Sequence, residues 1–159
     1  MKDTDMEQTV RSVIRRMTAS SVMNLAFARN LIREVEKKAQ EMGVKAVVAV
    51  SDAAGRPVAI ECMDGAYIGS FDVALNKTFT SVAFQMSTAE LGKLASPGGS
   101  LYGIQNTNDG KIVIFGGGEN LYVDDVLIGA IGVSGGTAEQ DTALGAYGKN
   151  IAKEVISWK

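Results

Sequence analysis

The sequence predicts an α+β fold in which a five-stranded antiparallel sheet is flanked by helices. Apolar residues recur with a helical period in some stretches and gather in short β-branched runs in others. The resulting order is one helix, two strands, two helices, three strands and one helix. Tight turns join neighbouring strands, which must therefore be antiparallel.

The first 21 residues are predicted to be separate from the domain at 22–159. A small, polar connector, 18–21, follows a helical stripe formed by Met6, Val10, Val13, Ile14 and Met17. Two interpretations are open. The segment is either an extra helix packed on its own domain or a docking peptide that lays its stripe into a groove of a partner.

The domain is predicted to begin with a helix that Asn24 caps and Gly43 ends. Strands at 45–51 and 57–63 follow, with a turn at 52–55 between them. The helix at 71–86 comes next, and its predicted buried face contains Phe71, Leu75, Thr78, Phe79, Val82, Ala83 and Met86.

The second half begins with a short helix, 88–94, for which Thr88 is the predicted cap. A long loop, 96–110, follows, and loops of this length in compact domains are often functional. The last three predicted strands are 111–115, 119–123 and 126–133, with a tight turn at Asp124-Asp125. The final helix is predicted from Ala138 to about Ser157, with a core face of Leu144, Tyr147, Ile151, Val155 and Trp158.

The stretch Val126–Asp141 contains a strand, a Ser-Gly-Gly turn and a helix start at which Thr137 and Gln140 have capping-box spacing. Gly129 and Gly132 leave room for another backbone or a flat ligand. The turn could bind an anion at the helix N-terminus, but it matches neither a Walker loop nor a dinucleotide fingerprint.

Composition excludes several classes of function. The 159 residues carry a net charge of −2, which predicts no nucleic-acid partner. One cysteine, no secretion signal and no apolar run of roughly 20 residues predict a cytoplasmic protein without a membrane partner. The chain has no histidine, which excludes Ser-His-Asp catalysis and leaves no predicted metal site.

Four charged residues could carry chemistry: Asp52, Asp64, Lys77 and Asp141. Each aspartate is either a catalytic acid or a carboxylate that binds backbone amides of a turn or helix start. Lys77 is either a Schiff-base or anion-binding lysine or a solvated helix lysine. The soft or phenolate iron ligands that the chain offers, each also explicable by core packing, are Cys62, Met63, Met86, Tyr67 and Tyr102.

Three motifs in order resemble one protein family. AVVAVSDAAGRPVAIECMDGAYIGSFDVALNKTFTS is followed by SPGGSLYGIQNTNDGKIVIFGGG and then by VLIGAIGVSGGTAEQD. The set resembles the GlcG/HbpS haem-binding, or haem-degrading, domain family over roughly 24–159. Within it, the sequence is most similar to OrfY-type proteins and to the C-terminal domain of PduO-type cobalamin adenosyltransferases.

The resemblance implies a profilin-like (GlcG-like) fold, a homo-oligomer that is commonly octameric, and haem as the cofactor. Relatives often have a histidine where Asn106 stands, so any haem here must use another ligand or bind without a strong axial bond. The cofactor-binding residues that the resemblance implies are Lys77, Tyr102, Gln105, Asn106, Phe115, Gly117 and Gly118.

The resemblance also gives the N-terminal segment a meaning. Cargo proteins of bacterial microcompartments often carry a short amphipathic helix and a linker that dock on shell proteins. We therefore expect an accessory protein of cobalamin-dependent diol or glycerol metabolism that binds a tetrapyrrole or small ligand, located in a microcompartment lumen. Two alternatives are an enzyme acting on a small metabolite through the four charged residues, and a non-catalytic oligomer that bridges cargo to shell.

Overall fold

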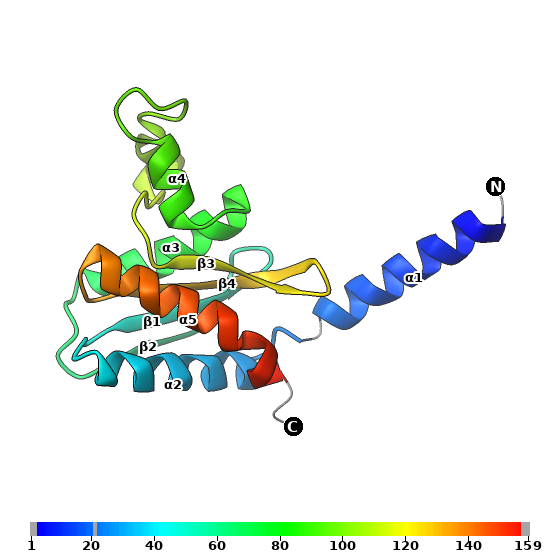
Figure 1. Ribbon diagram of the computed structural model, residues 1–159, viewed down its shortest axis with the longest axis horizontal. Helices are drawn as coiled ribbons and strands as arrows, with labels where there is room; N and C mark the ends of the chain where they lie inside the picture. Colours follow the sequence, from blue (N-terminus) through cyan, green and yellow to red (C-terminus); the bar gives the residue numbers. More distant parts are fainter. Residues whose placement is uncertain (1–2, 21, 157–159) are drawn as a thin grey trace.

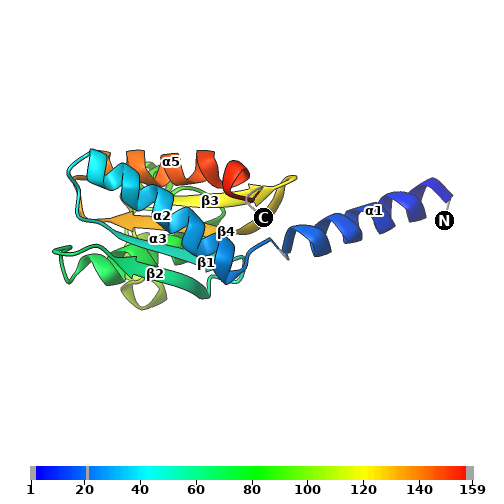
Figure 2. The ribbon, with the colours of Figure 1, turned by 90° about the horizontal axis from the view of Figure 1, so that it is seen from below.

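A four-stranded antiparallel sheet is the centre of the computed structural model, which describes residues 3–20 and 22–156 (Figure 1). The strands lie in the order β2-β1-β4-β3. Their bounds are Val47–Asp52 for β1, Pro57–Cys62 for β2, Gly118–Val123 for β3 and Val126–Ser134 for β4. Helices α2 (Leu25–Glu41) and α5 (Ala138–Ile156) cover one face of the sheet, and α3 (Ser70–Phe84) covers the other (Figures 1 and 2).

The prediction of five strands is wrong at residues 111–115, which do not join the sheet. Their backbone instead crosses between α3 and the short helix α4 (Thr88–Leu94). The Val113 amide donates to Thr80 Oγ1 at 3.0 Å, and a Cβ on Gly92 would collide with the Ile114 carbonyl. Helix groups thus replace the ladder partners that a strand would need, which a β-branched run alone cannot reveal.

The main core lies between the sheet and the α2–α5 layer, as the helical stripes predict. Leu31, Ile32 and Val35 of α2 and Leu144 and Val155 of α5 are buried in it. Asn24 caps α2 as predicted, because its Oδ1 accepts a hydrogen bond from the Phe27 amide at 3.0 Å. Trp158 and the predicted helix end at Ser157 lie outside the described residues.

The predicted buried face of α3 is mostly wrong, although Thr78, one of its seven residues, is fully buried. The residues that face the sheet are small or polar and include Ser70, Ala74, Lys77, Thr78 and Ser81. The predicted buried face is instead largely half-exposed, and Phe71 is 42% exposed. The reason is the close approach of the two layers: a Cβ on Gly132 of β4 would collide with the Ala74 carbonyl oxygen, so no side chain fits between the two backbones at that point.

One predicted turn and one predicted capping box are confirmed, and one predicted cap is wrong. Asp124 and Asp125 both have positive φ, 47° and 64°, as a tight hairpin turn requires. At the start of α5, the Thr137 hydroxyl and the Gln140 amide oxygen accept each other's backbone N–H groups, as the capping box predicts. The cap of α4 is Ser87, not Thr88.

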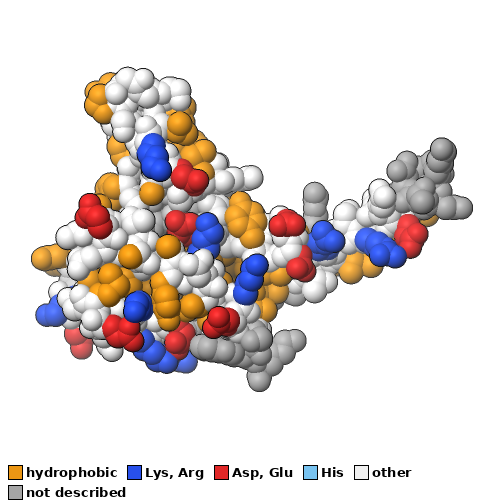
Figure 3. Space-filling view, viewed as in Figure 1, with side chains coloured by type: hydrophobic (Ala, Val, Ile, Leu, Met, Phe, Trp, Pro, Cys, Tyr) orange, Lys and Arg blue, Asp and Glu red, His pale blue; other side chains and the backbone are white. Residues whose placement is uncertain are grey.

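Helix α4 and the loop after it rise away from the sheet (Figure 1). The loop contains two short 3₁₀ helices, η1 (Ile104–Asn106) and η2 (Asn108–Gly110), and otherwise has the irregular structure predicted for 96–110. Apolar side chains reach the surface in this projecting region (Figure 3). Among them, Tyr102 is 68% exposed.

The N-terminal helix α1 (Asp3–Ser20) extends away from the rest of the molecule in both ribbon views (Figures 1 and 2). It continues through residues 18–20, which were predicted to be connector. Its apolar stripe is solvent-exposed, with Val13 at 48% and Met17 at 68% as the extremes. No helix in the described ranges is long and apolar enough to cross a membrane.

Candidate functional site

A buried ion pair joins α3 to α5 beneath the base of the projecting region. Lys77 is fully buried, and its Nζ donates to Asp141 Oδ2 at 3.0 Å and to the Val133 carbonyl at 2.7 Å. The other carboxylate oxygen of Asp141, Oδ1, accepts the Gly136 amide at 2.9 Å. The prediction of a solvated helix lysine is therefore wrong, because the small residues on either side of Lys77 turn its face of α3 toward the sheet.

The glycine run 116–118 passes directly over this pair. A Cβ on Gly117, whose φ is 115°, would lie 2.7 Å from Lys77 Nζ and 2.6 Å from the Val133 carbonyl oxygen. Gly118 is enclosed on another side, since its amide donates to Thr88 Oγ1 at 2.9 Å. The glycines thus allow the chain to pass close to a buried charge where no side chain has room.

Phe115 covers the ammonium group from the remaining side. The centroid of its ring lies 4.8 Å from Lys77 Nζ, a cation–π distance, and Phe115 is itself 45% exposed. An aromatic ring that is itself partly exposed to solvent therefore lies against the buried ammonium. Burial lowers the pKa of Lys77, and the nearby Asp141 carboxylate only partly offsets this effect.

The other three predicted cofactor residues lie in the projecting loop. Tyr102 and Asn106 are exposed, and Gln105 Oε1 is buried without a hydrogen-bond partner among the described residues. The loop encloses a shallow hollow of about 300 Å³ lined by residues 100–104 and Thr107. The seven predicted residues therefore form two groups, one in the loop and one at its base, and the structure records no contact between the groups.

Asp52 does not join the ion pair. It serves the turn after β1, where Oδ1 accepts the amides of Ala54 and Arg56, and Oδ2 pairs with the Arg56 guanidinium at 2.9 Å. Burial raises the pKa of Asp52, but these hydrogen bonds outweigh burial and lower it overall. The turn-carboxylate interpretation is thus the one that the geometry favours.

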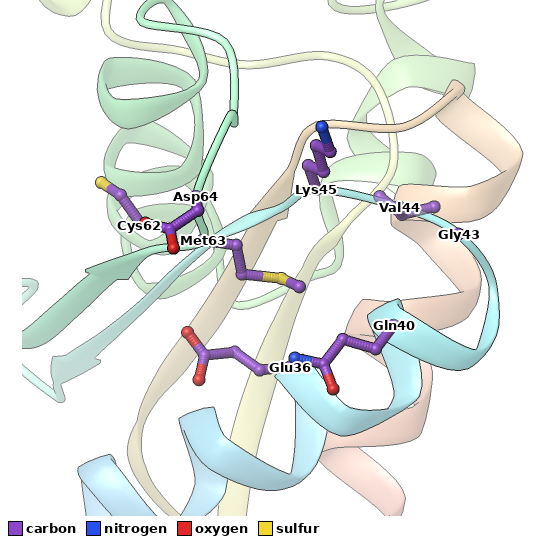
Figure 4. Close-up of a pocket in the computed structure, with 8 residues that line it drawn as sticks. All are labelled: Glu36, Gln40, Gly43, Val44, Lys45, Cys62, Met63 and Asp64. Carbon is purple, nitrogen blue, oxygen red and sulfur yellow. The ribbon is translucent and has the colours of Figure 1, made fainter.

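Asp64 lines a separate open pocket of about 540 Å³ between the end of α2 and the end of β2 (Figure 4). Glu36 and Gln40 of α2 line the same pocket, together with Cys62 and Met63. Burial and the neighbouring Glu61 carboxylate raise the pKa of Glu36, and Arg33 opposes them. The predicted four-residue catalytic centre is therefore not assembled: only Lys77 and Asp141 meet.

The five predicted iron ligands lie in different parts of the structure. Cys62 and Met63 line the pocket at the far end of β2, and Met63 Sδ accepts the Ala46 amide. Tyr102 is the only one of the five predicted iron ligands that lies in the projecting loop. The Tyr102 phenol is therefore the one predicted iron-binding group that the loop offers. Within 3–20 and 22–156, no group of three or more Cys, Asp or Glu side chains could hold a metal ion.

Sequence reasoning missed the partners that build the base of the site. Thr80 and Thr88 bind the backbone of residues 111–118, and Lys77 pairs with a residue 64 positions away. The available signal was the spacing of Ala74, Lys77, Thr78 and Ser81, which is a helical stripe of small side chains with one lysine inside it.

Comparison with known proteins places this geometry in a family. The corrinoid adenosyltransferase PduO of Salmonella typhimurium strain LT2 is 40% identical over 70% of this chain, which spans only 33% of that enzyme. The crystal structure of the Klebsiella pneumoniae protein ORFY is 40% identical, with a TM-score of 0.80, 82% of this chain covered and 90% of that one. The crystal structure of the PduOC:heme complex is 36% identical, with a TM-score of 0.75, and the match covers 78% of this chain and 90% of that one. A model of the haem-degrading protein HbpS-like family matches residues 23–149, and the chain belongs to this family.

Proposed function

We propose that the protein is a tetrapyrrole-binding accessory protein that binds its ligand, haem or a related ring, at the projecting loop. The observation that carries this proposal is the 36% identity, over 78% of this chain, to a structure described as a haem complex. In this chain the loop presents Tyr102 and the amide side chain of Asn106 to solvent, and it also contains Gln105, whose Oε1 is buried without a hydrogen-bond partner among the described residues. An aromatic face can stack on a porphyrin, and amides can bind its carboxylate edges.

The two groups of predicted residues have different roles in this proposal. Tyr102, Gln105 and Asn106 contact the ligand. Phe115 and the run of glycines at 116–118 form the base of the loop above Lys77. Bound haem would supply iron, for which Tyr102 is the available ligand.

Haemin titration tests the proposal. We expect a shifted Soret band and a raised melting temperature with the unaltered protein, because a ligand that binds only the folded state stabilises it by mass action. Tyr102→Ala should weaken binding by roughly tenfold, the effect of losing one stacking contact and the iron ligand. Tyr122→Ala, which removes an exposed tyrosine of β3, is the matched control. If neither haemin nor cobalamin shifts a spectrum or the melting temperature, the non-catalytic cargo oligomer is the better account.

We also propose a homo-oligomer, with eight subunits as the family resemblance implies. The support in this structure is the start of α3 and the turn before it, where Phe71 is 42% exposed, Tyr67 75% and Ile68 96%. Large apolar side chains gathered at a surface are typical of subunit contacts. Sedimentation velocity should give a species several times heavier than the 16.8 kDa chain, and Ile68→Glu with Phe71→Glu should dissociate it.

The third part of the proposal concerns α1. We propose that residues 1–21 dock on a shell protein and bring the protein into the lumen of a microcompartment for diol or glycerol metabolism. The exposed stripe that includes Val10, Val13 and Ile14 supports docking on an apolar groove. A fusion of residues 1–21 to a fluorescent protein should form puncta in cells that make shells. Val10→Asp with Val13→Asp should make the signal diffuse, and diffuse signal from the unaltered fusion would refute docking.

Corrinoid adenosyltransfer is not part of the proposal. This chain spans only a third of the adenosyltransferase that it resembles, and its resemblance implies the C-terminal domain rather than the transferase domain.

A further inference from the structure

Lys77 has a geometry that the proposed function does not use. Its ammonium donates to the Val133 carbonyl at 2.7 Å and to the Asp141 carboxylate at 3.0 Å, both fixed acceptors. Its remaining side faces the ring of Phe115 at 4.8 Å from the centroid. The lysine is 0% exposed, whereas Phe115 is 45% exposed. A buried amine with a carboxylate beside it and a movable cover is an arrangement suited to nucleophilic chemistry.

The cover can move at little cost. Phe115 lies in the segment that is outside the sheet, and three glycines follow it, of which Gly117 has a φ of 115°. Turning the ring away breaks a cation–π contact but no backbone hydrogen bond. The loss of such a contact changes an equilibrium by about five- to thirtyfold, so an open form with the amine uncovered would be a minor but accessible state.

The open form has a defined chemistry. The hollow left behind has the size of a phenyl ring, and the Lys77–Asp141 pair at its floor is neutral overall. A charged ligand would lose its hydration there without gaining a counter-charge, whereas a small neutral carbonyl compound would not. We propose that Lys77 is a reactive amine that forms an imine with a small neutral aldehyde in the hollow beneath Phe115.

The step balances without an oxidant or a reductant. Asp141 takes a proton from the ammonium, and the free amine attacks the carbonyl carbon, so a C–N bond forms while the C=O π bond opens. The oxygen takes a proton from the attacking nitrogen, which gives a carbinolamine. Asp141 then returns its proton to that oxygen, which leaves as water while the nitrogen lone pair forms the C=N bond. Ammonium and aldehyde thus give a protonated imine and water. Burial supports the first transfer, because it lowers the pKa of Lys77.

Reductive trapping tests the proposal. The full chain, without haem, is incubated with benzaldehyde and cyanoborohydride in phosphate buffer, and the modified lysines are located by peptide mass spectrometry. We expect Lys77, although fully buried, to be labelled before the exposed Lys93 and Lys111. If Lys77 is buried but not reactive, the order of labelling is reversed and Lys77 is labelled last or not at all. That result would overturn the proposal.

Two variants separate reactivity from a purely structural role. Phe115→Ala should speed labelling of Lys77 by about fivefold, the factor that corresponds to one cation–π contact, whereas Tyr122→Ala should leave the rate unchanged. Lys77→Arg keeps the charge and forms no imine, so labelling at this position should vanish while circular dichroism shows an intact fold. Should Lys77→Arg fail to fold, the comparison of Phe115→Ala with Tyr122→Ala decides alone: equal rates would refute gating by Phe115 and with it the proposal.

Discussion

Removing Lys77 tests the energetics of the buried pair most directly. In Lys77→Met the Asp141 carboxylate, whose side chain is 4% exposed, would keep the Gly136 amide but lose its counter-charge. Removing one partner of a buried ion pair typically costs about 3–5 kcal/mol, because the other charge stays buried and unpaired. The native state of a domain is usually stable by only about 5–15 kcal/mol, so this is a large part of the total.

Urea denaturation followed by far-ultraviolet circular dichroism measures the loss. With a dependence of about 2 kcal/mol per molar urea, the midpoint should fall by about 2 M. The double variant Lys77→Met with Asp141→Asn should lose less than the sum of the single losses, by about 0.5–3 kcal/mol, since it removes both charges. A loss below about 1 kcal/mol in Lys77→Met, or strict additivity, would show that the pair contributes no more than a surface ion pair does. Two protein concentrations separate unfolding from subunit dissociation.

Three further predictions concern stability. The pKa of Lys77 is lower in the folded protein than its ordinary 10.5, so between these two values the unfolded chain binds more protons than the folded one. The free energy of unfolding should therefore rise as pH increases toward 10.5. Urea melts across that range should show this rise in the unaltered protein and not in Lys77→Met. Gly132→Ala should destabilise the protein by at least about 2 kcal/mol, because the added Cβ would collide with the Ala74 carbonyl. Gly69→Ala is the control: its Cβ would meet no atom within 4 Å, so this change should be neutral or slightly stabilising. Equal melting temperatures for the two variants would contradict the tight α3–β4 contact. Ser87→Ala should cost about 1 kcal/mol through the lost cap of α4, as thermal unfolding can measure, and no change would mean that the capping box is not formed.

Much of the fold could be predicted because its signals are local. The caps at Asn24 and Thr137 and the hairpin at Asp124-Asp125 depend on residues within a few positions of one another, and all three are confirmed. The apolar stripe of α2 is also a local signal, because the helical period places these side chains on one face regardless of which element packs against it.

The errors share a different cause: each depends on what a segment meets from far along the chain. Residues 111–115 have the composition of a strand, but Thr80 supplies the hydrogen bonds that a neighbouring strand would have supplied. The apolar side of α3 has the composition of a buried side, but the close approach at Gly132 places the other side, whose side chains are mostly small, against the sheet.

The candidate site could be predicted only in part for the same reason. The residue types were recognised, since Lys77 and Asp141 both stood among the candidates, as did Phe115 and Gly117. The contact between Lys77 and Asp141 could not be predicted, because the two residues are 64 positions apart and no spacing rule connects them. The loop residues Tyr102 and Asn106 followed from the family resemblance rather than from any pattern of their own.

The close seating of α3 on β4 has a mechanical consequence. At Ala74 and Gly132 backbone lies against backbone with no side chain between them, so the two elements are expected to move as one stiff body. Any force on the outer side of α3 would then be passed to the sheet without being absorbed by side-chain rearrangement. Because Lys77 lies on the same helix, a subunit that contacts Phe71 would also affect the Lys77–Asp141 ion pair. Slower amide hydrogen exchange in β4 upon assembly would indicate this coupling.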